Sequence, residues 1–504
     1  MDLIGNLATG FSVALTPANL GFCFLGFCFL GALIGTLVGV LPGIAPITTI
    51  AMLLPFTFTL PPASSLIMLA GIFYGAQYGG STTAILVNVP GESSAIVTCL
   101  DGHQMARKGR AGPALAIAAI ASFAAGTIAT LIIATASAPM AWLALKFTAP
   151  EYFSLMVLGL TGAVVLAHGA PGKAVAMVVV GLMLGLVGID VNTGAPRMTF
   201  GIAELGDGIG FVPIAIGMFG IAELAVTLGR PQDRTLLDVK LGSLWPSREE
   251  FRASVPAMLR GTALGSILGV LPGGGAALSS FAAYAFEKKS SKTPERFGHG
   301  AIEGVAAPEA ANNAGAQTSF IPLLTLGIPG NAIMALMVGA MMIQGVQPGP
   351  QVMTSQPELF WGVIASMWTG NLMLIVLNLP LIGLWVSLLR VPYRLMFPAI
   401  VLFCCIGTYS VGNSAFDVGV MLLFALLGVF FIKVGAEPAP LILGFILGPL
   451  MEENFRRAMM LSRGDPMVFL ERPISAGLLI LSAVLFAVLV SPALRSGREK
   501  VFQE

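Results

Sequence analysis

Long apolar stretches alternate with short polar breaks along almost the whole chain. A stretch of roughly 20 apolar residues can cross a bilayer as one helix, whereas stretches of about 14–16 are more typical of half-helices or re-entrant hairpins. The pattern therefore predicts an all-α polytopic membrane protein with about 10–14 membrane segments, some of them broken. The stretches fall at about 20–41, 44–58, 64–99, 113–138, 153–168, 173–189 and 209–228, and then at 258–285, 301–346, 359–389, 396–412, 417–434, 438–450 and 474–490.

The composition agrees with a membrane protein. Charged residues make up 10% of the 504 residues and hydrophobic ones 56%, with a mean hydropathy of +0.89. Soluble domains carry roughly 25% charged residues, so a soluble enzyme, a disordered chain and a disulfide scaffold are excluded. The net charge of +1 gives no reason to expect nucleic acid as a partner. The partner that this composition does predict is the lipid bilayer.

Catalytic and metal chemistry has few candidate residues. The chain has 3 His and 5 Cys, with no CxxC pair and no His/Cys cluster at metal-ligand spacing. An intramembrane protease or lipid transferase would need a His/Asp/Glu or Ser/His constellation at depth. We therefore expect no enzyme activity, no cofactor and no resident metal.

The chain contains an internal repeat. A polar segment at 229–256 divides the apolar sequence into two halves, and each half contains two Pro-Gly pairs in the same order, near 42 and 90 and near 272 and 329. The sequence thus predicts one repeat at 1–230 and a second at 258–455. A cytoplasmic polar linker at 231–257 joins them, and a C-terminal extra helix and cytoplasmic tail follow at 456–504.

The charges predict that the two repeats have opposite orientations. The segment after the second Pro-Gly pair is basic in the first half, with Arg107, Lys108 and Arg110, whereas its counterpart at 344–356 has no Lys or Arg. In the second half the basic segment lies between the two pairs, at 288–296. Basic loops stay in the cytoplasm, so this is the pattern of inverted-topology repeats. The same rule places the N-terminus outside, since residues 1–106 lack Lys and Arg, and the C-terminus inside.

Inverted repeats with broken helices are typical of secondary transporters. A broken helix exposes N–H groups that bind anions and C=O groups that coordinate cations, and we expect each Pro of a Pro-Gly pair in the first turn of a new half-helix. The substrate-binding candidates are the small and amide residues near the second breaks: Asn88, Gly91, Ser93, Ser94, Asn312, Asn313, Gly330 and Asn331. The cation-coupling candidates are Gly43, Thr48, Thr49, Gly273, Ser279, Ser280, Glu92 and Glu309.

Each candidate has a structural alternative. Isolated Ser and Thr in membrane helices commonly bond their own i−4 carbonyl or hold helices together. Glu92 can cap its half-helix as an N-terminal acid, and the glycines can serve close helix packing. No Lys or Arg lies in these stretches, so a carboxylate would be held by helix dipoles and amides. A neutral ligand also fits.

Four stretches of the sequence resemble a known family. They are Gly39–Pro46 (GVLPGIAP), Tyr74–Glu92 (YGAQYGGSTTAILVNVPGE), Asp101–Leu115 (DGHQMARKGRAGPAL) and Gly304–Asn331 (GVAAPEAANNAGAQTSFIPLLTLGIPGN). They resemble the large membrane subunit, the TctA permease, of bacterial tripartite tricarboxylate transporters. One departure is Glu92, where the family would lead us to expect a small or hydroxylic residue.

The resemblance implies a permease of the bacterial inner membrane. Combined with the orientation that the charges predict, this places the N-terminus in the periplasm and the C-terminus in the cytoplasm. It implies two partners, a small four-helix membrane subunit and a periplasmic solute-binding protein. It further implies import of a small organic di- or tricarboxylate, citrate for example, by an elevator mechanism driven by a cation gradient, with Na⁺ preferred to H⁺. The alternatives that stay open are an H⁺-coupled importer of another small organic acid, a passive channel and an exporter.

Overall fold

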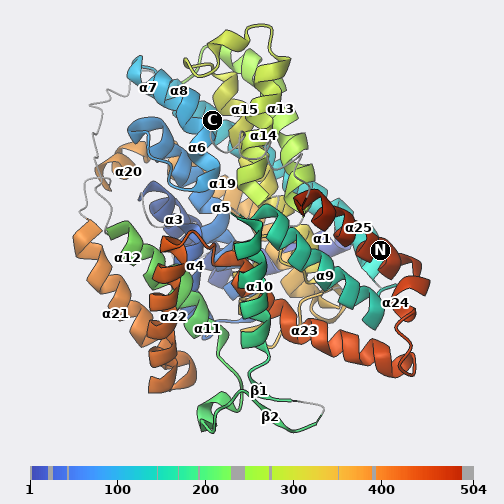
Figure 1. The fold of residues 1–504 in the computed structure, drawn as a ribbon. Coiled ribbons are helices and arrows are strands. Elements are labelled where there is room, and N and C mark those ends of the chain that lie inside the picture. Colours follow the sequence, from blue (N-terminus) through green and yellow to red (C-terminus); the bar gives the residue numbers. More distant parts are fainter. Residues whose placement is uncertain are drawn as a thin grey trace.

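The computed structural model describes residues 3–20, 26–41, 45–144, 146–167, 170–190, 193–228, 244–271, 275–349, 351–388 and 393–490. Within these ranges the chain is a bundle of helices with one short antiparallel hairpin, β1 (Gly188–Ile189) and β2 (Pro196–Arg197), at one end (Figure 1). The prediction of an all-α chain is confirmed for this part of the sequence. Gly43 and Gly273, and the prolines before them, lie outside the described residues.

The helices follow the predicted apolar stretches in order. The part before the polar segment contains α1 (Leu3–Ala14), α2 (Pro17–Leu20), α3 (Phe27–Val40), α4 (Pro46–Thr57), α5 (Pro62–Val87), η1 (Ser93–Ala95), α6 (Ile96–Thr98), η2 (Cys99–His103), α7 (Gln104–Arg107), α8 (Ala111–Ala144), α9 (Ala149–Leu166), α10 (Pro171–Gly185), η3 (Ala203–Leu205), α11 (Phe211–Ala215), η4 (Ile216–Ile221) and α12 (Ala222–Leu228).

The part after the polar segment has the same order of helix, break and helix. It contains α13 (Arg248–Val270), α14 (Gly275–Ser290), η5 (Pro294–Arg296), α15 (Glu303–Thr318), α16 (Phe320–Leu326), α17 (Ala332–Ile343), α18 (Val352–Ser355), α19 (Pro357–Asn378), α20 (Ile382–Leu388), α21 (Tyr393–Gly412), α22 (Ala415–Lys433), α23 (Ala439–Leu461), α24 (Val468–Glu471) and α25 (Pro473–Val490).

Five helical stretches among the described residues are long and apolar enough to cross a membrane. Shorter apolar helices of 10–17 residues accompany them, including α3, α4 and α17, which flank the breaks. Helix α4 falls in the short predicted stretch 44–58, whereas α3 and α17 fall in the longer stretches 20–41 and 301–346. The five are Ala111–Ser137, Phe211–Leu228, Arg248–Val270, Pro357–Asn378 and Ala415–Lys433.

One helix boundary and one whole helix differ from the prediction. Helix α13 begins at Arg248, inside the interval predicted as a linker, because Ser247 and Glu250 form a capping box in which each side chain bonds the other's backbone N–H. Helix α1 was not predicted at all. It packs against α19, and Gly10 lies directly on the backbone of Trp361. Tertiary contact therefore stabilises a helix of 12 residues, a length that is marginal in isolation.

Glycines set the closest helix contacts in both halves. Gly31, Gly35 and Gly39 of α3 lie on carbonyl groups of α5, and Gly261, Gly265 and Gly269 of α13 lie on carbonyl groups of α15. A Cβ at any of these positions would collide with backbone atoms. Small residues at four-residue spacing allow such approach in membrane helices, and here the same spacing recurs in equivalent helix pairs.

The two halves also exchange partners. Helix α8 packs against α15, and α19 packs against α5. In the same way α4 packs against α17, and α14 packs against η1. Helix α8 of the first half thus lies on α15 of the second half, and α19 of the second half lies on α5 of the first.

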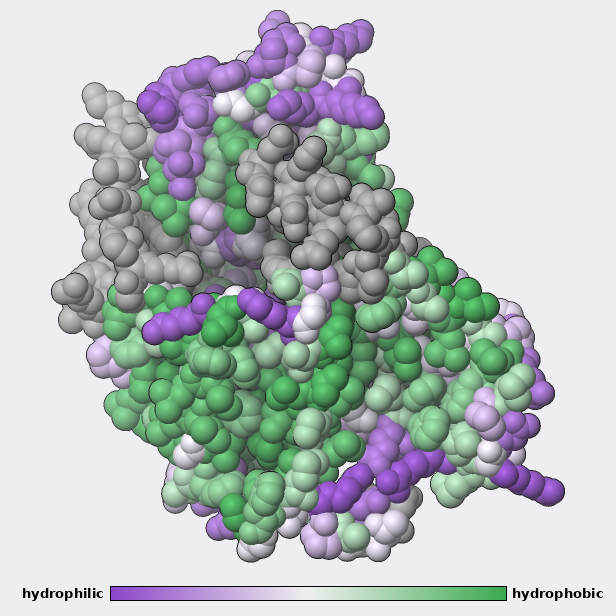
Figure 2. Space-filling view, in the orientation of Figure 1, coloured by the Kyte–Doolittle hydropathy of each residue, from purple (hydrophilic) through white to green (hydrophobic). Residues whose placement is uncertain are grey.

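Polar residues gather at both ends of the bundle, and a further row of them crosses the middle of this face (Figure 2). At one end the two basic loops meet, where the Lys108 Nζ donates to the carbonyl of His299 at 2.7 Å and Arg110 pairs with Glu250. At the hairpin end Arg456 pairs with Asp190 at 3.1 Å. Hydrophobic residues cover much of the described surface between these ends (Figure 2), as expected where helices face lipid.

Candidate functional site

The second breaks of the two halves have matching backbone geometry. Each begins at a residue in the left-handed region, Asn88 with φ 58° and Gly327 with φ 73°. Each ends at an extended N-cap residue, Glu92 with φ −149° and Asn331 with φ −155°. Left-handed residues commonly end helices, and Asn tolerates this conformation better than most residues do.

The prolines of these breaks do not lie where the sequence predicted. Pro90 and Pro329 each precede the N-cap by two residues, so they lie inside the turn rather than in the first helical turn. The left-handed residue has already ended the preceding helix, and a proline, which lacks an N–H, fits the turn that follows. The half-helices themselves begin at Ser93 and Ala332.

Asn331 caps the half-helix α17. Its side-chain oxygen accepts from the Met334 N–H at 3.0 Å, and its amide nitrogen donates to Ser319 Oγ at 3.4 Å. Asn331 also lies beside Gly275, where α14 begins after the first break. The two breaks of the second half are therefore neighbours. The same holds in the first half, where Gly91 packs on the carbonyl of Gly39 just before the first break.

Glu92 has the equivalent position but different contacts. Its carboxylate accepts from the Ser94 hydroxyl and from Asn312 Nδ2, the latter at 3.4 Å. Ser94 Oγ is also 3.1 Å from Gln77 Oε1. Ser93 and Asn88 are exposed at this break. The half-helix after Glu92 is irregular, passing from the 3₁₀ turn η1 through α6 to the π turn η2, a form that often marks functional sites.

Glu309 is fully buried at the meeting point of four helices. One carboxylate oxygen accepts from Ser81 of α5 at 2.5 Å, with Ser122 of α8 at 3.4 Å, and the other accepts from Thr98 of α6. None of the ion pairs in the described part of the chain includes Glu309. A buried carboxylate held only by hydroxyl groups is costly unless it takes up a proton or a cation.

A polar seam extends from Glu309 between α8 and α15. Asn313 Nδ2 donates to Ser122 Oγ at 2.7 Å. Two turns further along, Thr130 donates to Gln317 at 2.5 Å, and Gln317 donates to Asn371 of α19 at 3.1 Å. Residues four apart lie on one face of a helix. The polar side chains therefore form one line, with Ser122 and Thr130 on α8 and Glu309, Asn313 and Gln317 on α15.

The adjacent amides Asn312 and Asn313 serve different groups. Asn313 points into the seam, whereas Asn312 donates toward Glu92. Both are fully buried, and the side-chain oxygen of each has no hydrogen-bond partner. Gly330 is buried. A Cβ atom at this position would lie 3.9 Å from the carbonyl oxygen of Leu271, which is an ordinary van der Waals contact.

Four hydroxyl residues after the first breaks were candidates for cation coupling. Among the described hydrogen bonds, none joins them to Glu92 or Glu309. Thr48 donates to the carbonyl of Phe219 and to Glu223 Oε2, both at 2.7 Å. Ser279 bonds its own i−4 carbonyl, Gly275, at 2.7 Å. Thr49 and Ser280 are buried and their hydroxyls have no partner.

Several polar residues of this region were not predicted. They stand inside apolar stretches. A charged or amide residue at such depth is a signal that could have identified Glu223, Asn371 and Asn378, whereas Ser122 and Thr130 give no such signal, because isolated hydroxyls are common in membrane helices. They are Ser122, Thr130, Glu223, Asn371 and Asn378.

Comparison with known proteins identifies the family. The model of the tripartite tricarboxylate transporter TctA family matches residues 25–443. The chain belongs to the TctA family. Two relatives from Agrobacterium vitis are similar. One, described as an uncharacterized 52.8 kDa protein in the TAR-I ttuC′ 3′ region, is 60% identical over 504 residues, covering 100% of this chain and 99% of the relative.

The second relative, an uncharacterized protein in the TAR-II ttuC′ 3′ region, is 62% identical over 240 residues, which is 48% of this chain and 99% of the relative. No solved structure matches the chain. Membership of the TctA family makes the chain part of a transporter family rather than an enzyme family and places it in a membrane. All four breaks and both glutamates lie within the matched residues.

Proposed function

We propose that the chain is the permease subunit of a binding-protein-dependent tripartite transporter that imports a small organic di- or tricarboxylate. Import is coupled to a cation gradient, Na⁺ in preference to H⁺, and proceeds by elevator-type alternating access. The observation that carries this proposal is the pair of matching helix breaks at Asn88–Glu92 and Gly327–Asn331. The half-helix that follows the first of them contacts a buried, uncompensated carboxylate, Glu309, through Thr98.

Two inverted repeats are supported by the packing. Helix pairs α3–α5 and α13–α15 share the glycine spacing, and the partner exchange between halves is reciprocal. Transporters built on inverted repeats place substrate and ion sites at the repeat interface. The elements around the breaks are the proposed transport domain.

The proposed carboxylate site uses the half-helix starts. Free N–H groups at a helix N-terminus favour anions, and amides and hydroxyls add hydrogen bonds without a fixed buried cation. The assigned residues are Asn88, Gly91, Ser93, Ser94, Asn312, Asn313, Gly330 and Asn331. Because Asn331 also caps α17, its carboxylate contact would be made by the amide nitrogen.

The proposed coupling residues are two acids, the buried Glu309 and the half-buried Glu92, and the hydroxyls after the first breaks. Glu309 stands first among them because it is fully buried and its described partners are all neutral. Glu92, Thr48, Thr49, Ser279 and Ser280 complete the set, together with Gly43 and Gly273. The negative charges of these acids and of the carboxylate substrate would be balanced when Na⁺ or H⁺ enters with the substrate.

The proposal includes the remaining expectations from the resemblance. The partners are a small four-helix membrane subunit and a periplasmic solute-binding protein, and the location is the bacterial inner membrane, with the N-terminus in the periplasm. The contact between the two basic loops supports a shared cytoplasmic side for both.

The test is uptake of labelled citrate and dicarboxylates by proteoliposomes that contain this chain, the small subunit and the binding protein. Uptake is expected only with all three components, and Asn88→Ala or Asn331→Ala should abolish it while the protein still reaches the membrane. Uptake without the binding protein, or normal uptake by both variants, would contradict the proposed site.

A further inference from the structure

Asp101 is a fully buried carboxylate to which the proposed site gives no role. It lies in the π turn η2, which follows α6. One carboxylate oxygen accepts from the backbone N–H groups of Gly298, Gly300 and Ala301, at 2.9, 2.7 and 2.8 Å. The other accepts from the Tyr284 hydroxyl at 2.9 Å. All of these donors belong to the second half of the chain, whereas Asp101 belongs to the first.

The loop before α15 has a shape that suits a carboxylate. Gly298 and Gly300 have φ of 85° and 96°, a backbone conformation that glycine adopts readily and other residues rarely do. The loop thereby turns several N–H groups toward one point, and such a concave set of backbone N–H groups binds anions. A Cβ at Gly304, in the first turn of α15, would collide with Asp101 Oδ2. The loop and the start of α15 therefore fit this one side chain closely.

The π turn that carries Asp101 is also held against its own half of the chain. His103 Nδ1 lies 3.1 Å from the carbonyl oxygen of Ile85 on α5. A Cβ at Gly102 would lie 2.7 Å from Ile85 Cγ1, which is too close without a shift. Because η2 rests on α5 while its carboxylate bonds the loop before α15, Asp101 joins the two halves at this point.

Two contacts of the candidate site lie on the same half-helix as Asp101. The Thr98 hydroxyl donates to Glu309, and Glu92 at the N-cap accepts from Asn312 at 3.4 Å. Glu309 and Asn312 both belong to α15, and the loop before α15 is the one that bonds Asp101. A shift of the half-helix along α15 would therefore disturb both contacts together.

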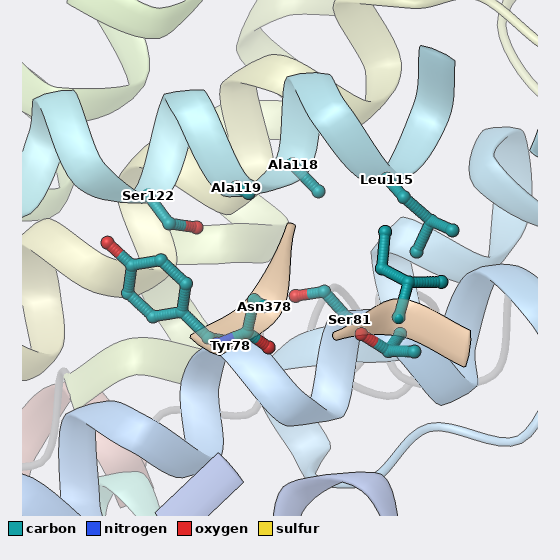
Figure 3. A pocket seen from close by; sticks show the side chains of 9 residues that line it. Tyr78, Ser81, Leu115, Ala118, Ala119, Ser122 and Asn378 are labelled. Atoms are coloured by element: carbon teal, nitrogen blue, oxygen red, sulfur yellow. The ribbon is translucent and has the colours of Figure 1, made fainter. Parts of the chain in front are cut away.

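The other hydroxyl partners of Glu309 have firmer supports. Figure 3 shows Ser81 on α5 and Ser122 on α8, on opposite walls of a small cavity of about 10 Å³. These two helices have 26 and 34 residues and pack against each other and against α15. Thr98 instead belongs to a helix of 3 residues between a 3₁₀ turn and a π turn. So short a helix is not stable by itself, so its position depends on the contacts at its ends.

We propose that Asp101 is a positioning residue for transport. It holds the half-helix at 93–103, which consists of η1, α6 and η2, on α14 and α15 in one register, and so keeps the contacts to Glu309 and Asn312 in place. The inference rests on the proposed function for the roles of these two contacts. The hold on the half-helix is a property of the fold and can be measured without transport.

Hydrogen exchange of the purified full chain in detergent tests the hold on the half-helix, because amide exchange reports local opening. Asp101→Ala removes every bond of the carboxylate and should speed exchange at 93–103 by roughly tenfold or more, since bonds to an ionised group are strong. Asp101→Asn keeps one oxygen for the backbone N–H groups, and its NH₂ can donate to the Tyr284 oxygen. Exchange in this variant should stay within about threefold of the parent chain.

Uptake kinetics in proteoliposomes with all three components test the link to transport. Asp101→Ala should raise the KM for the carboxylate roughly tenfold, measured per folded chain, and Asp101→Asn should restore it. A role in folding alone would lower the number of folded chains and leave KM unchanged. Glu151→Ala is the matched control, because Glu151 is also a buried carboxylate but bonds the Thr148 N–H at 2.9 Å and Arg472. It should change neither KM nor exchange at 93–103.

A second variant decides the matter if Asp101→Ala yields no folded protein. Tyr284→Phe removes a single bond and should speed exchange at 93–103 by about threefold; exchange equal to that of the parent chain would overturn the inference. An unchanged KM in Asp101→Ala, or an equal rise of KM in Glu151→Ala, would also overturn it. Faster exchange in Asp101→Ala that Asp101→Asn reverses supports the inference even if the parent chain shows no uptake, a result that would contradict only the proposed function.

Discussion

The substitution Glu309→Gln tests the role of the buried carboxylate while keeping its size. In the structure the carboxylate accepts hydrogen bonds from Ser81 and Thr98, with Ser122 nearby. Hydrogen bonds to a charged group contribute about 1.5–3 kcal/mol each, against about 0.5–1.5 kcal/mol for neutral ones. The amide keeps one acceptor oxygen and turns the other position into a donor. The expected loss is therefore about 2–5 kcal/mol of hydrogen bonding.

A gain of similar size opposes this loss. Burying an ion costs several kcal/mol after relaxation, and Gln removes that cost. Hydroxyl groups can also rotate to accept from the new NH₂. The net change in unfolding free energy should therefore lie within about 2 kcal/mol of zero, which is ordinary for a single substitution. The effect on cation coupling has no such compensation, because the negative charge that the proposal assigns to the coupling cation is lost.

The assay combines thermal unfolding of the purified variant with carboxylate uptake in proteoliposomes. Glu309→Gln should unfold within a few degrees of the parent chain in Na⁺-free buffer, lose the rise in unfolding temperature that Na⁺ binding should give the parent chain, and lose Na⁺-driven accumulation. Glu309→Asp, which keeps the charge on a shorter side chain, should retain part of both. A Gln variant that accumulates carboxylate with normal Na⁺ dependence would refute the assignment of Glu309 as the coupling charge.

Three further predictions concern the breaks and the helix packing. Asn88→Gly should keep the stability of the chain, since Gly also adopts φ 58°, but should abolish uptake if the amide contacts substrate; expression and uptake are measured together. Asn331→Ala should lower the unfolding free energy by about 1 kcal/mol through loss of the N-cap, whereas Asn331→Ser should keep the cap. Thermal unfolding therefore separates the capping role from substrate binding when both variants lose uptake. Gly265→Val should prevent α13 from packing on Ala311 of α15 and should severely reduce the amount of folded protein in the membrane, as measured by fluorescence-detected size exclusion. Gly477→Val is the control, because Gly477 is exposed and a side chain there meets open space.

Most of the helical order could be predicted from the sequence, because apolar length is a direct physical requirement of a bilayer. The start of α13 at Arg248 could not, since a capping box and not apolarity sets it. Helix α1 could not either, because its contact with α19 is a tertiary effect. Positions of both second breaks were predicted from Pro-Gly pairs, but the residues that end the helices are Asn88 and Gly327.

The candidate site was predicted only in part, because the sequence does not show which helix faces pack together. Asn312 and Asn313 are adjacent in sequence, yet they face different groups, and periodicity alone does not say which face meets which partner. Ser81 and Ser122 become part of one site only when α5 and α8 come together around Glu309. Thr48 looked like a residue of the break, but its hydroxyl bonds Glu223 on a distant segment.

The most direct test of the central claim is the ion dependence of uptake by proteoliposomes that contain the chain, the small subunit and the binding protein. Labelled citrate or dicarboxylate is supplied with an inward Na⁺ gradient, with equal Na⁺ on both sides, or with a protonophore added. The account predicts accumulation above the external concentration only with the inward Na⁺ gradient, and no effect of the protonophore. Accumulation that ignores Na⁺ and collapses with the protonophore would contradict Na⁺ coupling, and equilibration without accumulation under every condition would indicate a passive channel.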